Sequence, residues 1–215
     1  MKYGESVFDI LYLGFAITAG ILILRRGRGR TEKLMGFAAL ILGCGDAFHL
    51  IPRVLNYFLD ADMTAALGIG KLVTSITMTV FYVLLAEIWA GVYAAPLSGR
   101  IRGLILGLSA IRIILCLFPQ NGWLENSSDL RWGIIRNAPF VMLGGIVCWL
   151  YFRKKGENST MKWMWLYILL SFLFYIPVAV AAGLLPILGM LMLPKTVCYI
   201  LMIVDFLRYA RKGTQ

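Results

Sequence analysis

Acidic side chains and histidine are scarce in this sequence. Its 215 residues include only 11 Asp and Glu against 21 Lys and Arg, and a single histidine. One histidine cannot build a cluster of several histidine ligands, and the cysteines show no CxxC or Cys/His metal spacing. We therefore expect no metal and no cofactor, and we interpret the cysteines as small apolar packing residues. They are Cys44, Cys116, Cys148 and Cys198.

Charged residues of both signs together are also rare. They make up 15% of the chain, whereas 60% is hydrophobic and the mean hydropathy is +0.79. Soluble globular domains carry about 25% charged residues. The composition therefore excludes an ordinary soluble enzyme or binding domain and predicts an integral membrane protein.

Long apolar segments take up most of the chain. A hydrocarbon core of roughly 30 Å requires about 20 apolar residues per helix. The first segment is predicted to span the membrane and not to be a cleaved signal, because its basic residues follow the apolar run. We predict a single all-α domain, 1–215, that forms a bundle of seven transmembrane helices. Their predicted spans are about 7–25, 34–54, 64–93, 101–118, 133–152, 162–182 and 190–208.

Basic residues gather in alternate connections between these segments, and the connections in between are neutral or acidic. Cytoplasmic loops carry an excess of Lys and Arg, so the pattern predicts an outside N-terminus and a cytoplasmic C-terminus. We expect a bacterial cytoplasmic membrane as the location. The same pattern accounts for the net charge of +10 without a nucleic-acid partner. The residues concerned are Arg25, Arg26, Arg28, Arg30, Lys33, Arg100, Arg102, Arg153, Lys154, Lys155, Lys162, Arg208, Arg211 and Lys212.

A second group of basic residues falls within the apolar segments. The group consists of Arg53, Lys71, Arg112, Arg136 and Lys195, one on each of five predicted helices. The predicted orientation places all of them in the outer half of the bundle, where only Asp46 and Asp9 are available as counter-charges. One explanation for these cations is structural: some extend their side chains to the membrane interface and others form ion pairs. The other, which we favour, is a water-accessible cavity for an anion, because two anions cannot neutralise five cations at a depth where unpaired charge is costly.

Helical spacing places several polar side chains on shared faces. Asp46, His49 and Arg53 follow one another at intervals of three and four residues, so they lie on one side of their helix. Instead of binding a ligand, the Ser, Thr and Tyr residues could form hydrogen bonds that hold neighbouring helices together. The predicted ligand-binding residues are Arg53, Lys71, Ser75, Tyr82, Arg112, Arg136, Asn137, Tyr175, Lys195 and Tyr199.

These patterns favour an outward-facing cationic cavity that binds an anionic small molecule or a lipid headgroup, for transport or sensing, with membrane lipids as partners. The alternative is an intramembrane enzyme that acts on a lipid substrate, with Asp46 and His49 as its acid/base pair. A receptor with Lys195 as a Schiff-base amine is a third possibility, which rests only on a helix count and one residue.

Two smaller features predict contacts within the bundle. Glu87 and Asp205 lie near the cytoplasmic ends of their helices and are expected to pair with nearby basic residues, Asp205 with Arg208. Glycines such as Gly68 and Gly70, or Gly144 and Gly145, permit close helix contacts. Such contacts can form within one chain or between two, so the oligomeric state stays open.

Overall fold

The computed structural model describes residues 2–59, 61–126, 129–181 and 186–212. Across these ranges the chain is almost entirely helical and contains no strand. The apolar segments form helices because no other open structure satisfies the backbone polar groups inside a bilayer. The elements are α1 (Lys2–Arg26), α2 (Arg30–Phe58), α3 (Thr64–Val92), α4 (Gly99–Leu117), the 3-10 helix η1 (Pro119–Asn121), α5 (Leu130–Arg153), α6 (Met164–Ala181), the 3-10 helix η2 (Pro186–Leu191) and α7 (Met192–Lys212).

The α-helices in the described ranges confirm the seven predicted segments. Each predicted span overlaps one helix almost completely, and the main differences are extensions at the ends, as in α2, which passes both limits of the predicted 34–54. Hydropathy locates the apolar part of a helix. The polar turns beyond it, such as the first turn of α1, continue the backbone hydrogen bonding without adding to the apolar signal.

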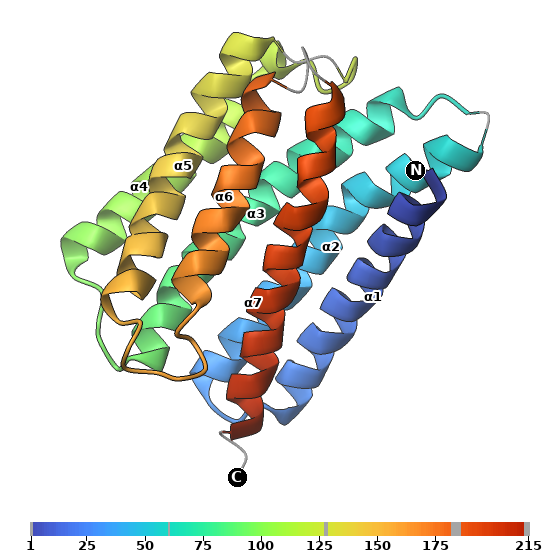
Figure 1. The fold of residues 1–215 in the computed structure, drawn as a ribbon. Coiled ribbons are helices and arrows are strands. Elements are labelled where there is room, and N and C mark those ends of the chain that lie inside the picture. The colour runs from blue at the N-terminus through green and yellow to red at the C-terminus, as the bar shows by residue number, and fades with distance from the viewer. Residues whose placement is uncertain (1, 60, 127–128, 182–185, 213–215) are drawn as a thin grey trace.

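The helices pack as a closed ring (Figure 1). Each helix contacts the next along the chain, and α7 closes the ring against α1. In addition, α3 contacts α5 and α2 contacts α7, so α2 and α3 reach across the interior. We call the end that holds Lys2 and the connections α2–α3, α4–α5 and α6–α7 the upper end, and the opposite end, which holds the end of α7, the lower end.

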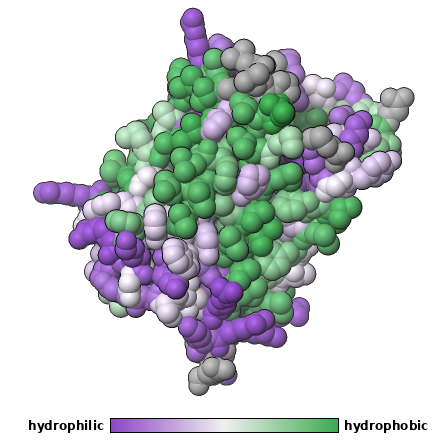
Figure 2. All heavy atoms as spheres, in the orientation of Figure 1, coloured by the Kyte–Doolittle hydropathy of each residue, from purple (hydrophilic) through white to green (hydrophobic). Residues whose placement is uncertain are grey.

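The surface of the bundle is apolar between its two ends. Figure 2 shows a hydrophobic band across the middle of the visible face and hydrophilic residues gathered at the ends. Side chains such as Phe37, Ile111 and Ile114 are large, hydrophobic and exposed. Within the described residues, five helical segments are long and apolar enough to cross a membrane, namely α1, α2, α3, α5 and the stretch from η2 through α7. The chain is therefore a membrane-embedded helical bundle.

Glycines allow α1, α2 and α3 to approach one another closely. An ideal Cβ at Gly70 would overlap the carbonyl oxygen of Phe48, and one at Gly36 would lie 3.1 Å from the carbonyl oxygen of Gly20. Small residues at such positions bring helix backbones together and increase van der Waals contact. On α5, Gly144 packs against the Phe172 ring, whereas a Cβ at Gly145 would meet nothing within 4 Å.

The lower end collects the basic connections, and its acidic residues form ion pairs. Arg102 donates two hydrogen bonds to Glu87, of 3.1 and 3.0 Å. Arg208 donates to Asp205 at 3.2 Å, which confirms the predicted pair. Because these acids are occupied at the lower end, they do not neutralise the cations of the upper half.

Candidate functional site

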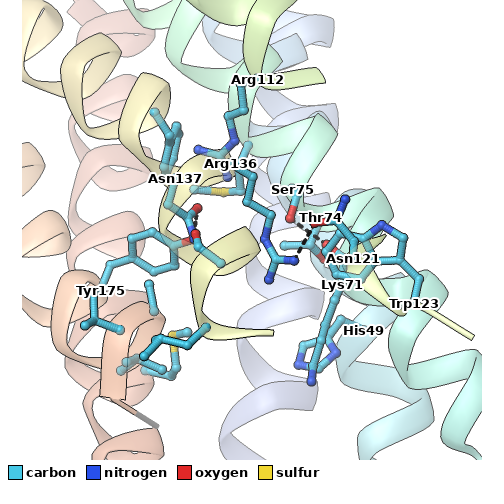
Figure 3. A pocket seen from close by; sticks show the side chains of 18 of the residues that line it. His49, Lys71, Thr74, Ser75, Arg112, Asn121, Trp123, Arg136, Asn137 and Tyr175 are labelled. Atoms are coloured by element: carbon cyan, nitrogen blue, oxygen red, sulfur yellow. Dashed lines mark hydrogen bonds between the residues drawn. The ribbon is translucent and has the colours of Figure 1, made fainter. Parts of the chain in front are cut away.

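A cavity of about 650 Å³ lies in the upper half of the bundle (Figure 3). It is partly open, and six of the α-helices together with the α4–α5 connection supply its walls. The lining residues are His49 of α2; Lys71, Thr74, Ser75 and Met78 of α3; Arg112 of α4; Asn121, Gly122, Trp123 and Asn126 of the connection; Leu130, Gly133, Arg136, Asn137 and Phe140 of α5; Tyr175, Val178, Ala179 and Val180 of α6; and Met192 and Lys195 of α7.

Arg112 is the most deeply buried cation of the cavity. The residue is only 2% exposed, although its neighbours Ile111 and Ile114 lie on the exposed face of α4. Its Cζ atom lies 3.3 Å from the centroid of the Phe140 ring, which provides a cation–π contact. Its Nε and Nη1 atoms have no hydrogen-bond partner among the described residues. Its polar neighbours are the Tyr175 hydroxyl and the Cys116 thiol, neither of which is a carboxylate. A guanidinium held in this way can still form charge-assisted hydrogen bonds to an anion.

Arg136 is held by the α4–α5 connection. Its Nη1 donates to the Oδ1 of Asn121 at 2.8 Å, and its Cζ lies 4.5 Å from the centroid of the Trp123 ring. The amide of Asn121 in turn donates to the carbonyl oxygens of Leu115 and Phe118, each at 2.8 Å. Leu115 lies in the last turn of α4 and Phe118 is its C-cap residue, the region where a helix leaves carbonyl acceptors without partners. The connection therefore fixes Arg136 through a side chain that also caps α4.

Trp123 anchors the same connection to α4 and α3. Its indole Nε1 donates to the carbonyl oxygen of Cys116 at 2.8 Å. Its own carbonyl oxygen approaches Gly68 so closely that a Cβ there would overlap it. Gly122 has φ 58°, a left-handed conformation that glycine adopts at low cost. The position of Trp123 beside Arg136 therefore depends on two glycines, Gly68 of α3 and Gly122 of the turn.

The two lysines of the cavity have only neutral direct partners among the described residues. Lys71 Nζ donates to the Oδ1 of Asn126 at 2.7 Å. Lys195 Nζ lies 4.4 Å from the centroid of the Tyr175 ring and is attracted electrostatically by Asp46, without a direct ion pair. The Asp46 carboxylate instead accepts a hydrogen bond of 2.7 Å from the Tyr12 hydroxyl. Neither ammonium group therefore has a carboxylate in direct contact.

The cavity lining, all of it within the described residues, contains no Asp or Glu. It contains two arginines and two lysines together with His49, whose Nδ1 also has no hydrogen-bond partner among the described residues. The Tyr175 hydroxyl donates to Asn137 Oδ1 at 2.6 Å, so these neutral side chains bond to each other (Figure 3). The lining is therefore positively charged, with Asp46 outside it as a partial counter-charge for Lys195, and this favours an anionic guest.

Most of the predicted ligand-binding residues lie together around this cavity. They are Lys71, Ser75, Arg112, Arg136, Asn137, Tyr175 and Lys195, with His49 of the predicted acid/base pair. Arg53 lies apart from the lining, because its Nη2 forms an ion pair of 2.6 Å with Asp9 of α1. Asp46 also lies outside the lining, where it accepts from Tyr12 and forms no hydrogen bond with His49.

Tyr82 and Tyr199 likewise do not line the cavity. Both are buried in the core; the Tyr82 hydroxyl lies 3.1 Å from Ser171 Oγ, and the Tyr82 ring packs 5.1 Å from that of Phe140. The Tyr199 ring lies 6.0 Å from the Phe81 ring. These aromatic contacts fill the interior next to the cavity, which matches the structural explanation for hydroxyl groups in a membrane bundle.

Three residues of the α4–α5 connection were missed by the sequence analysis. Asn121, Trp123 and Asn126 line the cavity, and each contacts or orients one of its cations. The sequence Pro-Gln-Asn-Gly at 119–122 indicates a turn but not where its side chains point. The burial of Asn121, which is 0% exposed, depends on the fold of α4 and α5 around it.

No protein-family model, curated protein or solved structure matches the chain.

Proposed function

We propose that this protein binds an anionic small molecule or a lipid headgroup in the upper cavity, for transport or sensing. In this proposal all seven helices span the membrane, the N-terminus is outside and the C-terminus is cytoplasmic, so the cavity opens towards the outer side. The support for the orientation is the concentration of basic residues at the lower end.

The observation that carries the proposal is Arg112. A cation at membrane depth costs several kcal/mol unless it pairs with an anion or contacts water. Without a ligand, this cost lowers the free energy of unfolding of the protein. Nε and Nη1 of Arg112 have no partner among the described residues, and no carboxylate lines the cavity around them. The Phe140 ring and the Tyr175 hydroxyl beside Arg112 carry no full negative charge, whereas an anion in the cavity would supply charged acceptors.

Among the five cations within the apolar segments, Arg53 is the one that structural pairing explains. Arg53 forms an ion pair with Asp9, although its Nε, like that of Arg112, has no hydrogen-bond partner among the described residues. The four cations that line the cavity have amide or aromatic neighbours instead of direct carboxylate partners. This contrast within one bundle favours ligand binding at the cavity and structural pairing at Arg53.

The enzyme alternative receives less support from the geometry. An acid/base pair requires its two groups within hydrogen-bond reach. Asp46 bonds to Tyr12, and the electrostatic neighbours of His49 are Lys71, Arg53 and Lys195. His49 lines the cavity without a carboxylate to orient it, so we retain it as a cavity residue and assign it no catalytic step.

Replacement of Lys71 by methionine tests the anion site. We expect the variant to lose about 10- to 100-fold in affinity for a bound anion, because one charge-assisted hydrogen bond contributes about 1.5–3 kcal/mol. Native mass spectrometry of the purified protein measures the occupancy of co-purified anions, and added pyrophosphate or phosphatidylglycerol measures binding directly. Arg131→Met is the matched control, since Arg131 is exposed near the same end and does not line the cavity.

Equal occupancy in the Lys71→Met variant and in the wild type would contradict the proposal. A wild-type protein that carries no anion and is not stabilised by either added probe would contradict it as well.

The proposed orientation predicts the fate of a C-terminal fusion. Green fluorescent protein placed after Gln215 is expected to fluoresce, because it folds in the cytoplasm but not after export in unfolded form. Alkaline phosphatase at the same position is expected to be inactive, because it requires an oxidising compartment for its disulfides. An active phosphatase and a dark fluorescent protein would reverse the orientation.

A further inference from the structure

The cavity has two chemically different walls. On one side lie the cations of α3, α4 and α5. On the other side lie Val178, Ala179 and Val180 of α6 and Met192 of α7, which we call the apolar wall; the fourth cation, Lys195, follows one turn after Met192. The apolar wall extends to the surface of the bundle, because Val180 is 41% exposed, and Leu130 of α5, which also lines the cavity, is 46% exposed. A guest can therefore have one part among the cations and another part near the lipid.

The cationic wall suits a head with more than one negative charge. Arg112 and Arg136 present guanidinium groups, which donate hydrogen bonds in a fixed fork, and Lys71 adds an ammonium group. A single carboxylate would neutralise one of these cations and leave the others unpaired. A phosphate monoester carries a charge between about −1.5 and −2 at neutral pH and offers three acceptor oxygens, so it can serve several donors at once.

The size of the cavity also argues against a bare ion. Its volume of about 650 Å³ lies within the range of pockets that enclose drug-sized organic ligands. Inorganic phosphate would leave the apolar wall without contacts. An amphiphile would fill both walls.

We propose that the ligand is a phosphate-monoester amphiphile, with its phosphate between Arg112, Arg136 and Lys71 and its apolar chain along Val178, Val180 and Met192. This inference rests on the proposed function and adds the chemical class of the ligand. The phosphate chemistry is common to a lipid and to a soluble phosphate ester, and the apolar wall favours the lipid.

Binding of four probes to the full chain in detergent micelles tests the inference. The probes are oleoyl lysophosphatidic acid, which has both parts, glycerol phosphate, which has only the head, oleate, which has a monoanionic head, and oleoyl lysophosphatidylcholine, whose head is zwitterionic. We expect lysophosphatidic acid to bind about tenfold or more tightly than each of the others, because only it uses both walls. Thermal unfolding and native mass spectrometry measure the binding.

A substitution on α5 that faces the apolar wall tests the tail separately from the head. Gly133→Leu adds a side chain to the lining, and its Cβ would have one neighbour, the carbonyl oxygen of Ala179 at an ordinary 3.6 Å. We expect this variant to lose the preference for lysophosphatidic acid, because its affinity for lysophosphatidic acid should fall more than its affinity for glycerol phosphate. Gly145→Leu is the matched control on α5, because a Cβ there meets nothing within 4 Å and the residue lies outside the cavity. Val180→Asn introduces a polar side chain at an exposed position of the apolar wall. It tests binding of the tail without adding volume at Gly133.

The outcomes distinguish this inference from the function on which it rests. Equal binding of glycerol phosphate and lysophosphatidic acid, lost in Arg112→Met, would overturn the amphiphile and leave the anion site intact. Equal binding of all three oleoyl compounds, unchanged in Arg112→Met, would overturn both. Binding of none of the four probes would overturn the inference, and the pyrophosphate and phosphatidylglycerol experiment would then decide the anion site by itself.

Discussion

Replacing Arg112 by methionine is expected to stabilise the ligand-free protein and to abolish stabilisation by the anion. A charge at the centre of a membrane helix costs about 2.5–3.5 kcal/mol, which is an upper limit for Arg112 because it lines a partly open cavity near the upper end of α4. The variant no longer buries a guanidinium without a carboxylate partner, but it loses the contact with Phe140, and a desolvated cation–π contact contributes about 2 kcal/mol. We therefore expect a net gain of at most about 1 kcal/mol in the free energy of unfolding without ligand.

The loss with ligand is expected to be larger. A ligand present at 100 times its dissociation constant stabilises a protein by about 2.7 kcal/mol, and the variant should show almost none of this. Thermal unfolding with and without the anion measures both effects on the same sample. The change in stability should be positive without the anion and negative with it, because a buried binding residue lowers the stability of the free protein and is stabilised only by its ligand.

Arg53→Met is the informative comparison for this experiment. Arg53 has a counter-charge, Asp9, whose side chain is only 5% exposed, so its removal leaves an unpaired buried carboxylate and should destabilise the protein. The anion should still bind, because Arg53 does not line the cavity. If Arg112→Met destabilised the ligand-free protein as much as Arg53→Met, Arg112 would have a structural role and would not be held ready for an anion.

Gly68→Ala is expected to displace the α4–α5 connection and to weaken anion binding. An added Cβ would overlap the carbonyl oxygen of Trp123, a backbone atom that cannot rotate away. Overpacking of this kind costs about 1–3 kcal/mol. Movement of Trp123 would also move Asn121 away from Arg136, so the guanidinium would lose its fixed position. Thermal unfolding, the emission wavelength of tryptophan and anion affinity should all change together.

Gly103→Ala on α4 provides the control. An added Cβ at Gly103 would meet nothing within 4 Å, so the only expected effect is a gain of about 0.5–1 kcal/mol from the better helix propensity of alanine. If Gly68→Ala left stability and binding unchanged, like this control, the close seat of Trp123 on α3 would not be needed for the cavity.

The helices and the cations of the cavity could be predicted from the sequence for simple reasons. Hydropathy is a local property, and a segment such as 64–93 is apolar enough to specify a helix regardless of its neighbours. Cations such as Lys71 and Arg112 were recognised because a charge within an apolar segment must face the interior or water. Their depth followed from the direction of each helix, which the alternating basic connections indicated.

Partners across the bundle were beyond the reach of the sequence. Arg53 stands in the same sequence context as the other cations, yet Asp9, 44 positions away, neutralises it. Tyr12 likewise occupies Asp46 from a distance of 34 positions. Which helix faces carry these side chains towards each other depends on the rotation and packing of α1 against α2, and spacing within one helix contains no information about either.

The sequence by itself determined that the chain is a helical membrane bundle with too many cations in its upper half, because apolar length and charge depth are local properties. Only the tertiary structure decided which cations remain unneutralised. The ring closure of α7 on α1, the close approach of Trp123 to Gly68 and the pairing of Arg53 with Asp9 are long-range contacts. They leave Arg112, Arg136, Lys71 and Lys195 around one cavity without a carboxylate in its lining, because packing, and not composition, sets which charges can reach each other.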